Sequence, residues 1–387
     1  MKYIFSAFLI VVTSATLFAQ TLNREERNPV NQFAFKIYND LVPATSNFMF
    51  SPLSIHQAVA MLAEGSAGKT KEKLSELLAG AASSNSPDLF ANALKPETKD
   101  ALKLFNSAWH NEKFGLNKRY LELLQRKYYA DVFTYSDNTI GQINREANNW
   151  VSSKTNNKIK ELPLAITSGS LITLMNVAYF LAEWELEFKK KDTKKRTFSS
   201  ITKTKQKIDF MYKRTQLAYF EDDDFQAVKL PYKENAYSMI LVVPKQKFGL
   251  PSFEKKMDEK RFAQLLSPIT YKEVILHLPK FKIESELLLS QSPVIADIFK
   301  AGSDFSLIDP LNRAIGGDIA HKTFIEIDEK KTEAAALSEV IVIGYGGGPV
   351  QLPPPKIVDA DHPFLFFIID NKTNSIAFMG RYADALK

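Results

Sequence analysis

The sequence predicts a single α+β domain, and three observations support this fold class. In the N-terminal half, apolar residues recur with the period of a helix. In residues 31–41, for example, one helical face would carry Phe33, Ile37, Tyr38 and Leu41. From about Ile172 the apolar residues instead form short continuous runs, such as residues 238–243 and 364–369, which are typical of buried strands. No Gly- or Ser-rich linker separates the halves, so we expect one domain that mixes helices with sheet.

The first residues have the pattern of a secretory signal peptide. Lys2 precedes an apolar run from Tyr3 to Val12, and small residues follow as far as Ala19. A membrane anchor is the alternative, but hydroxyl residues interrupt the apolar run, which is also too short to span a bilayer comfortably. We therefore expect residues 1–19 to be removed and residues 20–387 to form a secreted, extracellular protein that is not bound to a membrane.

The residue types also exclude several chemistries. The chain has no Cys, which rules out disulfides, thiolate metal sites and a cysteine nucleophile. Its five His lack the paired spacing of a zinc protease, and the sequence has neither a Gly-x-Ser-x-Gly elbow nor a Gly-x-x-x-x-Gly-Lys phosphate loop. Basic and aromatic residues are not interleaved as in a nucleic-acid-binding surface. We expect no enzymatic activity, no cofactor, no metal and no nucleic-acid partner.

Positive charge is concentrated in one segment. The formal net charge is +6, and the run from Lys189 to Arg196 is Lys-Lys-Lys-Asp-Thr-Lys-Lys-Arg. Such a run is able to bind an anionic polysaccharide. A solvated loop between strands is the simpler interpretation, and the sequence favours it.

One segment near the C-terminus differs from both halves. From Glu329 the chain passes through a charged start, the apolar run 340–343 and the glycines of 344–348 to three consecutive prolines ending at Pro355. The apolar part is typical of a strand, but no sheet accepts the glycines and prolines that follow. The pattern predicts a long loop, at about residues 329–355, that is able to become a strand.

Many separate motifs between Asn31 and Tyr382 resemble those of the serpin family, and they occur in the family's order. They include Asn-Phe-Met-Phe-Ser-Pro-Leu-Ser-Ile at 47–55, Asn-Val-Ala-Tyr-Phe at 176–180, Leu-Pro-Lys-Phe-Lys at 278–282, Asp-His-Pro-Phe at 361–364 and Phe-Met-Gly-Arg at 378–381. The resemblance implies the serpin fold: a helical N-terminal part packed on a large central mixed β-sheet, with two further sheets and an exposed reactive-centre loop.

The resemblance also implies functional positions. Ser51, Ser54, Asn176 and His321 match the shutter, a polar cluster beneath the point where the central sheet opens, and Trp184 matches the breach, where the loop first enters. The loop hinge corresponds to Glu329, Lys331, Thr332, Glu333, Ala334, Ala335 and Ala336. Two motifs depart from the family pattern, because Leu181-Ala182 stand in place of Lys-Gly and Lys331 stands in place of the hinge Gly.

Strand geometry gives a test of the loop that does not depend on the family. An inserted strand points every second residue to one face. Counted from Thr332, that set contains only small or apolar residues as far as Gly344, whereas the alternate set carries Lys331, Glu333 and Glu339. One face is therefore fit for burial and the other is largely polar, as insertion requires.

The reactive centre follows from the usual length of the family's loop. Counting forward from the hinge reaches Tyr345 followed by Gly346, whereas counting back from His362 reaches Leu352, where the following Pro353 disfavours cleavage. Tyr345 implies a chymotrypsin-like serine protease as partner, with an elastase-like protease as the alternative. The resemblance implies a monomer that traps the protease as a suicide substrate by loop insertion. A non-inhibitory serpin acting as a carrier, storage protein or chaperone is the competing hypothesis, and Lys331 supports it.

Overall fold

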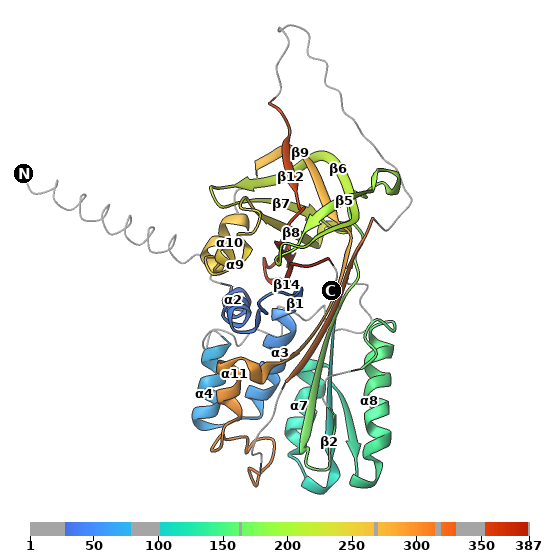
Figure 1. Ribbon diagram of the computed structural model, residues 1–387. Coiled ribbons are helices and arrows are strands. Elements are labelled where there is room, and N and C mark those ends of the chain that lie inside the picture. Colours follow the sequence, from blue (N-terminus) through green and yellow to red (C-terminus); the bar gives the residue numbers. More distant parts are fainter. Residues whose placement is uncertain are drawn as a thin grey trace, which may run out of the picture.

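The computed structural model describes residues 28–78, 101–161, 165–266, 270–313, 319–329 and 353–385. Strands form two sheets, and helices pack mainly against the smaller one (Figure 1). The described α-helices are α2 (Pro29–Leu41), α3 (Pro52–Glu64), α4 (Gly68–Leu77), α7 (Lys118–Tyr128), α8 (Ile140–Lys154), α9 (Leu250–Glu254), α10 (Glu259–Leu266) and α11 (Pro293–Ala296).

The smaller sheet is mixed, as expected for the central sheet. Its five strands lie in the order β10 (Phe281–Leu288), β11 (Ala320–Ile327), β4 (Ile172–Phe180), β2 (Leu102–Asn111) and β3 (Asp131–Tyr135). The pairs β10/β11 and β4/β2 are antiparallel, whereas β11/β4 and β2/β3 are parallel. The N-terminal half therefore contributes β2 and β3 to the sheet as well as the expected helices.

The two further sheets implied by the resemblance are joined here into one nine-stranded sheet. Its strands are β1 (Phe48–Phe50), β14 (Ile376–Tyr382), β13 (Phe364–Asp370), β8 (Tyr237–Pro244), β7 (Phe225–Pro231), β6 (Lys205–Glu221), β9 (Thr270–Pro279) and β12 (Lys356–Asp359), with β5 (Lys194–Ser199) paired to β6. The join is made by β6, which is 17 residues long and pairs with β5 at one end, with β7 at the other and with β9 over most of its length.

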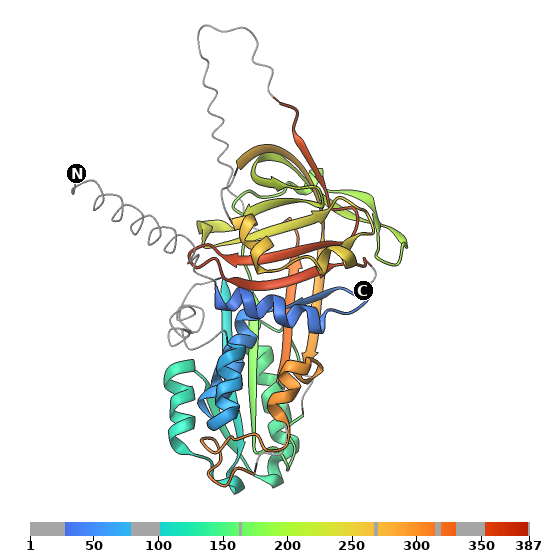
Figure 2. The ribbon, with the colours of Figure 1, turned by 90° about the vertical axis from the view of Figure 1, so that its left-hand side faces the viewer.

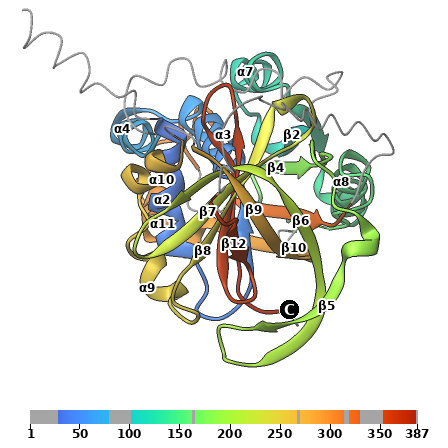
Figure 3. The same ribbon diagram turned by 90° about the horizontal axis from the view of Figure 1, so that it is seen from above.

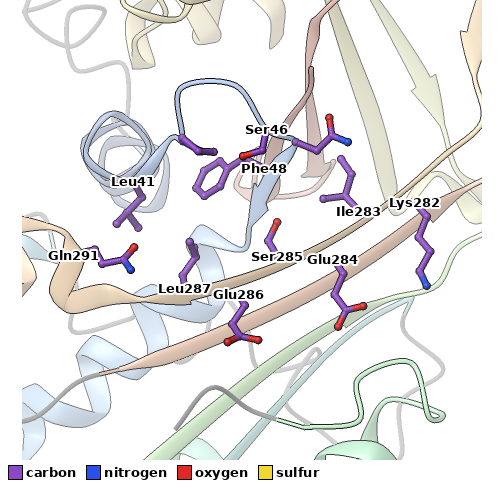
Figure 4. A pocket seen from close by; sticks show the side chains of 12 residues that line it. Leu41, Ser46, Phe48, Lys282, Ile283, Glu284, Ser285, Glu286, Leu287 and Gln291 are labelled. Carbon is purple, nitrogen blue, oxygen red and sulfur yellow. The ribbon is translucent and has the colours of Figure 1, made fainter. Parts of the chain in front are cut away.

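Alternating side chains explain how the edge strand β10 fits. Ile283, Ser285 and Leu287 face α2 and β1, while the intervening Glu284 and Glu286 point away from them (Figure 4). Ser285 Oγ accepts a hydrogen bond of 2.9 Å from Met49 N of β1. The two sheets are thereby connected at this edge, beside a cavity of about 580 Å³.

Two helices cover opposite faces of the five-stranded sheet. Helix α3 begins at Pro52 after the N-cap Ser51, and twelve of its thirteen residues are buried. All of these except His56 and Gln57 are apolar or small, so the helix is fit for burial on all sides. Helix α8 is amphipathic and buries Ile143, Trp150 and neighbouring apolar residues against Met175, Val177 and Phe324 of the sheet. Figure 2 shows α2 and α3 lying one above the other.

A close backbone approach makes Gly380 a sensitive position in the core. A Cβ atom at Gly380 would lie 2.6 Å from both Phe48 O and Phe366 Cζ. We expect Gly380→Ala to lower the free energy of unfolding by about 1–3 kcal/mol, because β1 and β13 would have to move apart. The matched control is Gly141→Ala on the exposed side of α8, where the nearest atom is 3.9 Å away. That variant should be neutral or stabilising by up to about 1 kcal/mol. Thermal unfolding followed by circular dichroism checks both, and equal midpoints would contradict this packing.

Candidate functional site

A buried polar cluster joins the start of α3 to β11 and β4, two adjacent inner strands of the five-stranded sheet. Ser51 N donates a 3.0 Å hydrogen bond to His321 Nε2 on β11, and Ser54 Oγ donates to Asn176 Oδ1 on β4. Asn176 and His321 are directly opposite each other in the β11/β4 register. The structure therefore brings together all four residues that the resemblance assigned to the shutter.

The cluster extends further than the sequence indicated. Asn176 Nδ2 donates a 2.6 Å hydrogen bond to Asn106 Oδ1 on β2, and Asn106 Nδ2 donates to Tyr128 O at 2.8 Å. Thr323 Oγ1 of β11 donates to Met49 O at 3.1 Å. Asn106 and Thr323 are not distinctive in the sequence, so only the register of the strands reveals their part in the network.

Burial decides the charge state of His321. The side chain is 1% exposed, and burial lowers its pKa from 6.5 to about 3. The ring is therefore neutral near pH 7, in agreement with Nε2 accepting from Ser51 N. The buried, neutral imidazole thus links β11 to the backbone amide of Ser51.

The parallel strands β11 and β4 are paired over only part of their length. Their register runs from Ala320↔Met175 to Phe324↔Tyr179, while β11 continues to Ile327. A cavity of about 420 Å³ lies at this end of the two strands, where Phe180, Leu181 and Ala182 of β4 and the following turn face residues 324–328. Beyond Phe324, β11 thus has no paired strand on the β4 side in the described part of the chain, and we call this the open end of the β11/β4 pair. The predicted loop departs from this end.

Trp184 lines this cavity. Its indole stacks on Tyr232 with ring centroids 4.4 Å apart, and its Nε1 donates a 3.0 Å hydrogen bond to Asp328 O. Trp184 therefore lies at the open end of the β11/β4 pair. The resemblance assigned Trp184 to the breach, and the structure places it beside the end of β11 from which the predicted loop departs.

Glu329, the first hinge residue, is held by two side chains. Lys280 Nζ lies 2.7 Å from Glu329 Oε2, and Thr193 Oγ1 donates a 2.7 Å hydrogen bond to Oε1. Burial would raise the pKa of Glu329, but the hydrogen bonds from Lys280 and Thr193 outweigh it, so the pKa lies below its usual value. The chain is thus fixed at the point where the predicted loop begins. The sequence motif contained Lys280 but did not show its partner.

The remaining predicted positions, Lys331 to Ala336 and the reactive centre Tyr345–Gly346, lie outside the described residues. The chain is described again from Pro353, and β12 follows at Lys356. Across the described ranges, no group of three His, Asp or Glu side chains is arranged to hold a metal ion. In the same ranges, none of the helices has the length and apolar character needed to cross a membrane.

The buried histidines make stability depend on pH. His56 also lies inside the core, where burial lowers its pKa to about 4. Each ring takes up a proton near pH 6.5 only in the unfolded chain, so stability is complete above pH 6.5 and falls as the pH decreases toward the folded pKa. We expect a loss of about 2 kcal/mol per histidine between pH 7 and pH 5, and His321→Gln should remove about half of the combined loss. Urea unfolding midpoints at pH 8, 7 and 5 check this. Identical pH dependence in the variant would contradict a neutral, buried His321.

The chain is similar to known proteins over nearly its whole length. Residues 28–385 match the family described as serpin, serine protease inhibitor. The leukocyte elastase inhibitor of Xenopus tropicalis is 32% identical, with 91% of this chain and 97% of that protein covered. The native-state structure of tengpin, a thermophilic serpin, is 28% identical, with a TM-score of 0.77 and coverage of 93% of this chain and 94% of that one. Thyroxine-binding globulin, solved with thyroxine, shares the fold at 22% identity, with a TM-score of 0.79 and coverage of 93% and 99%. From its sequence, its strand order and these likenesses, the chain belongs to the serpin family.

Proposed function

We propose that this protein is a secreted inhibitor that traps chymotrypsin-like or elastase-like serine proteases by inserting its reactive-centre loop between β11 and β4. The main support is the parallel β11/β4 pair with its open end at Trp184. A chain that leaves β11 and folds back runs antiparallel to β11, and hence antiparallel to β4 as well. A strand inserted between them would pair with both neighbours in the favourable antiparallel arrangement.

The length of the loop suits this movement. Cleavage after Tyr345 would leave the sixteen residues 330–345 attached to β11 through Glu329. As an extended strand they would span about 53 Å at about 3.3 Å per residue. This length exceeds that of β2, which has ten residues. A protease held as an acyl-enzyme at Tyr345 would therefore be carried past the far end of the sheet.

The polar cluster supports the same proposal. Opening the sheet separates β11 from β4, and the side chains of Asn176 and His321 need partners in both arrangements. Their bonds to Ser54 and Ser51 come from α3, beneath the sheet, and do not cross between the two strands. The strands are thus able to part without leaving these polar groups without partners.

One observation favours a different role. Lys331 stands where the family has the hinge Gly, and the fold is shared with thyroxine-binding globulin. A carrier of this fold would keep the architecture without trapping a protease. The neutral inward face of residues 332–344 supports the inhibitor instead, because a carrier would have no need to keep the charges of these residues on one face.

The proposed target class gives the first test. Incubation with chymotrypsin should yield a covalent complex that survives boiling in detergent, and trypsin should yield little or none, because the sequence has no Lys or Arg from 332 to 355. Mass spectrometry should place the acyl bond at Tyr345. A fast trypsin complex, or a bond outside residues 342–346, would refute the assignment. Cleavage by every protease, without a complex and without a gain in heat resistance, would indicate the carrier.

A pair of charge substitutions tests insertion itself. Ala334→Arg should turn the inhibitor into a substrate, because an unpaired charge would be buried as the loop enters the sheet, at a cost of several kcal/mol. Glu333→Arg places the same charge on the opposite face and should leave most inhibition intact. The measurement is the ratio of cleaved free protein to stable complex for each variant against one chymotrypsin-like protease. If both variants behave alike, the face assignment is wrong.

A further inference from the structure

Figure 1 shows β5, β6 and β9 in the upper part of the molecule and α8 in the lower part, and Figure 3 shows the same strands from above. Side chains of these three strands and of Asp192 line a small pocket. Its volume is about 270 Å³, and the residues that line it are Asp192, Lys194, Arg196, Phe210, Tyr212 and His277. None of these residues takes part in the shutter or the breach. The pocket includes the last part of the basic run 189–196 that the sequence singled out.

Two nitrogen atoms in the pocket walls are buried without a hydrogen-bond partner. They are Arg196 Nη1 and His277 Nδ1. The Arg196 guanidinium is otherwise fixed, because Nη2 donates a 2.5 Å hydrogen bond to Asp359 Oδ2 and the group lies 5.3 Å from the centre of the Phe210 ring. A buried donor that stays unsatisfied costs about 1–3 kcal/mol. A bound acceptor would remove that cost.

The charge around the pocket favours an anion. Lys189, Lys190, Lys191 and Lys195 are exposed, and none of them forms an ion pair within the described residues. Within the pocket walls the charges nearly balance, because Asp192 lies with Lys194 and because Arg196 pairs with Asp359, whose Oδ1 is also buried without a partner. The positive excess therefore comes from the four exposed lysines. Burial and the nearby Arg196 lower the pKa of His277, although Asp359 opposes this. A bound anion would restore part of the lost proton affinity.

We propose that this pocket binds a tetrahedral oxyanion of the sulfate or phosphate type, held by Arg196, His277 and Lys194. Several oxygen atoms on one centre are able to accept from all three side chains at once. The cavity volume of about 270 Å³ leaves room for the group to which the anion is attached. The exposed lysines extend the positive surface for a longer sulfated chain, so the source is either a free anion or a sulfated polysaccharide.

Calorimetric titration of the full-length mature protein with sodium sulfate, and separately with a sulfated heparin disaccharide, tests the site. We expect His277→Gln and Lys194→Gln each to weaken binding at least tenfold. Lys207→Gln, which removes an exposed charge from the same β5/β6 hairpin outside the pocket, should change it less than twofold. Because a ligand that binds only the folded state raises the unfolding temperature, thermal shifts should follow the same order.

The two probes identify the source of the anion. Binding of sulfate and disaccharide with similar affinity assigns the pocket to a free anion, whereas much tighter binding of the disaccharide assigns it to a polysaccharide. Absence of binding by both probes, or equal weakening in all three variants, would overturn the proposal, since the second result indicates only diffuse electrostatic attraction. These experiments need no protease, so their outcome is independent of the proposed inhibition.

Discussion

The hydrogen bonds between the start of α3 and the adjacent strands β11 and β4 are the constraint on which the rest of the structure depends. At the N-terminus of α3, Ser51 forms a hydrogen bond with His321 of β11, and Ser54 forms one with Asn176 of β4. Ser51 also caps the helix, since its Oγ accepts from Ser54 N at 3.2 Å and donates to Ala377 O at 2.7 Å. One residue therefore starts the helix, contacts β11 and reaches β14 of the other sheet. A shift of α3 would therefore disturb the helix cap and the contacts with both β11 and β14.

The sequence predicted the larger features because they depend on local pattern. Apolar runs marked the buried strands, and the motif at 47–55 placed the start of α3. The four shutter residues came from matched motifs, and their proximity follows from a register that links residues 176 and 321. No local pattern encodes that long-range pairing.

The contacts that the sequence missed are those that depend on three-dimensional packing alone. Asn106 joins the network because β2 lies beside β4, and Thr193 reaches Glu329 because the basic segment folds against the end of β11. The partial β11/β4 register is also invisible in the sequence, since β11 and the motif at 176–180 both have uninterrupted strand patterns. The loop itself was described only by its sequence pattern.

The anchoring of Glu329 by Lys280 and Thr193 gives the chain a fixed origin from which loop length is measured. Beyond a fixed origin, the direction of each side chain in an extended strand depends on the number of residues that precede it. Adding or deleting one residue just after Glu329 would transfer every later side chain to the opposite face. Adding two would preserve the faces and displace the end of the strand by about 6.6 Å. Under the proposed insertion, length changes in this segment would be tolerated in pairs, and an odd change would place the charged residues on the buried face.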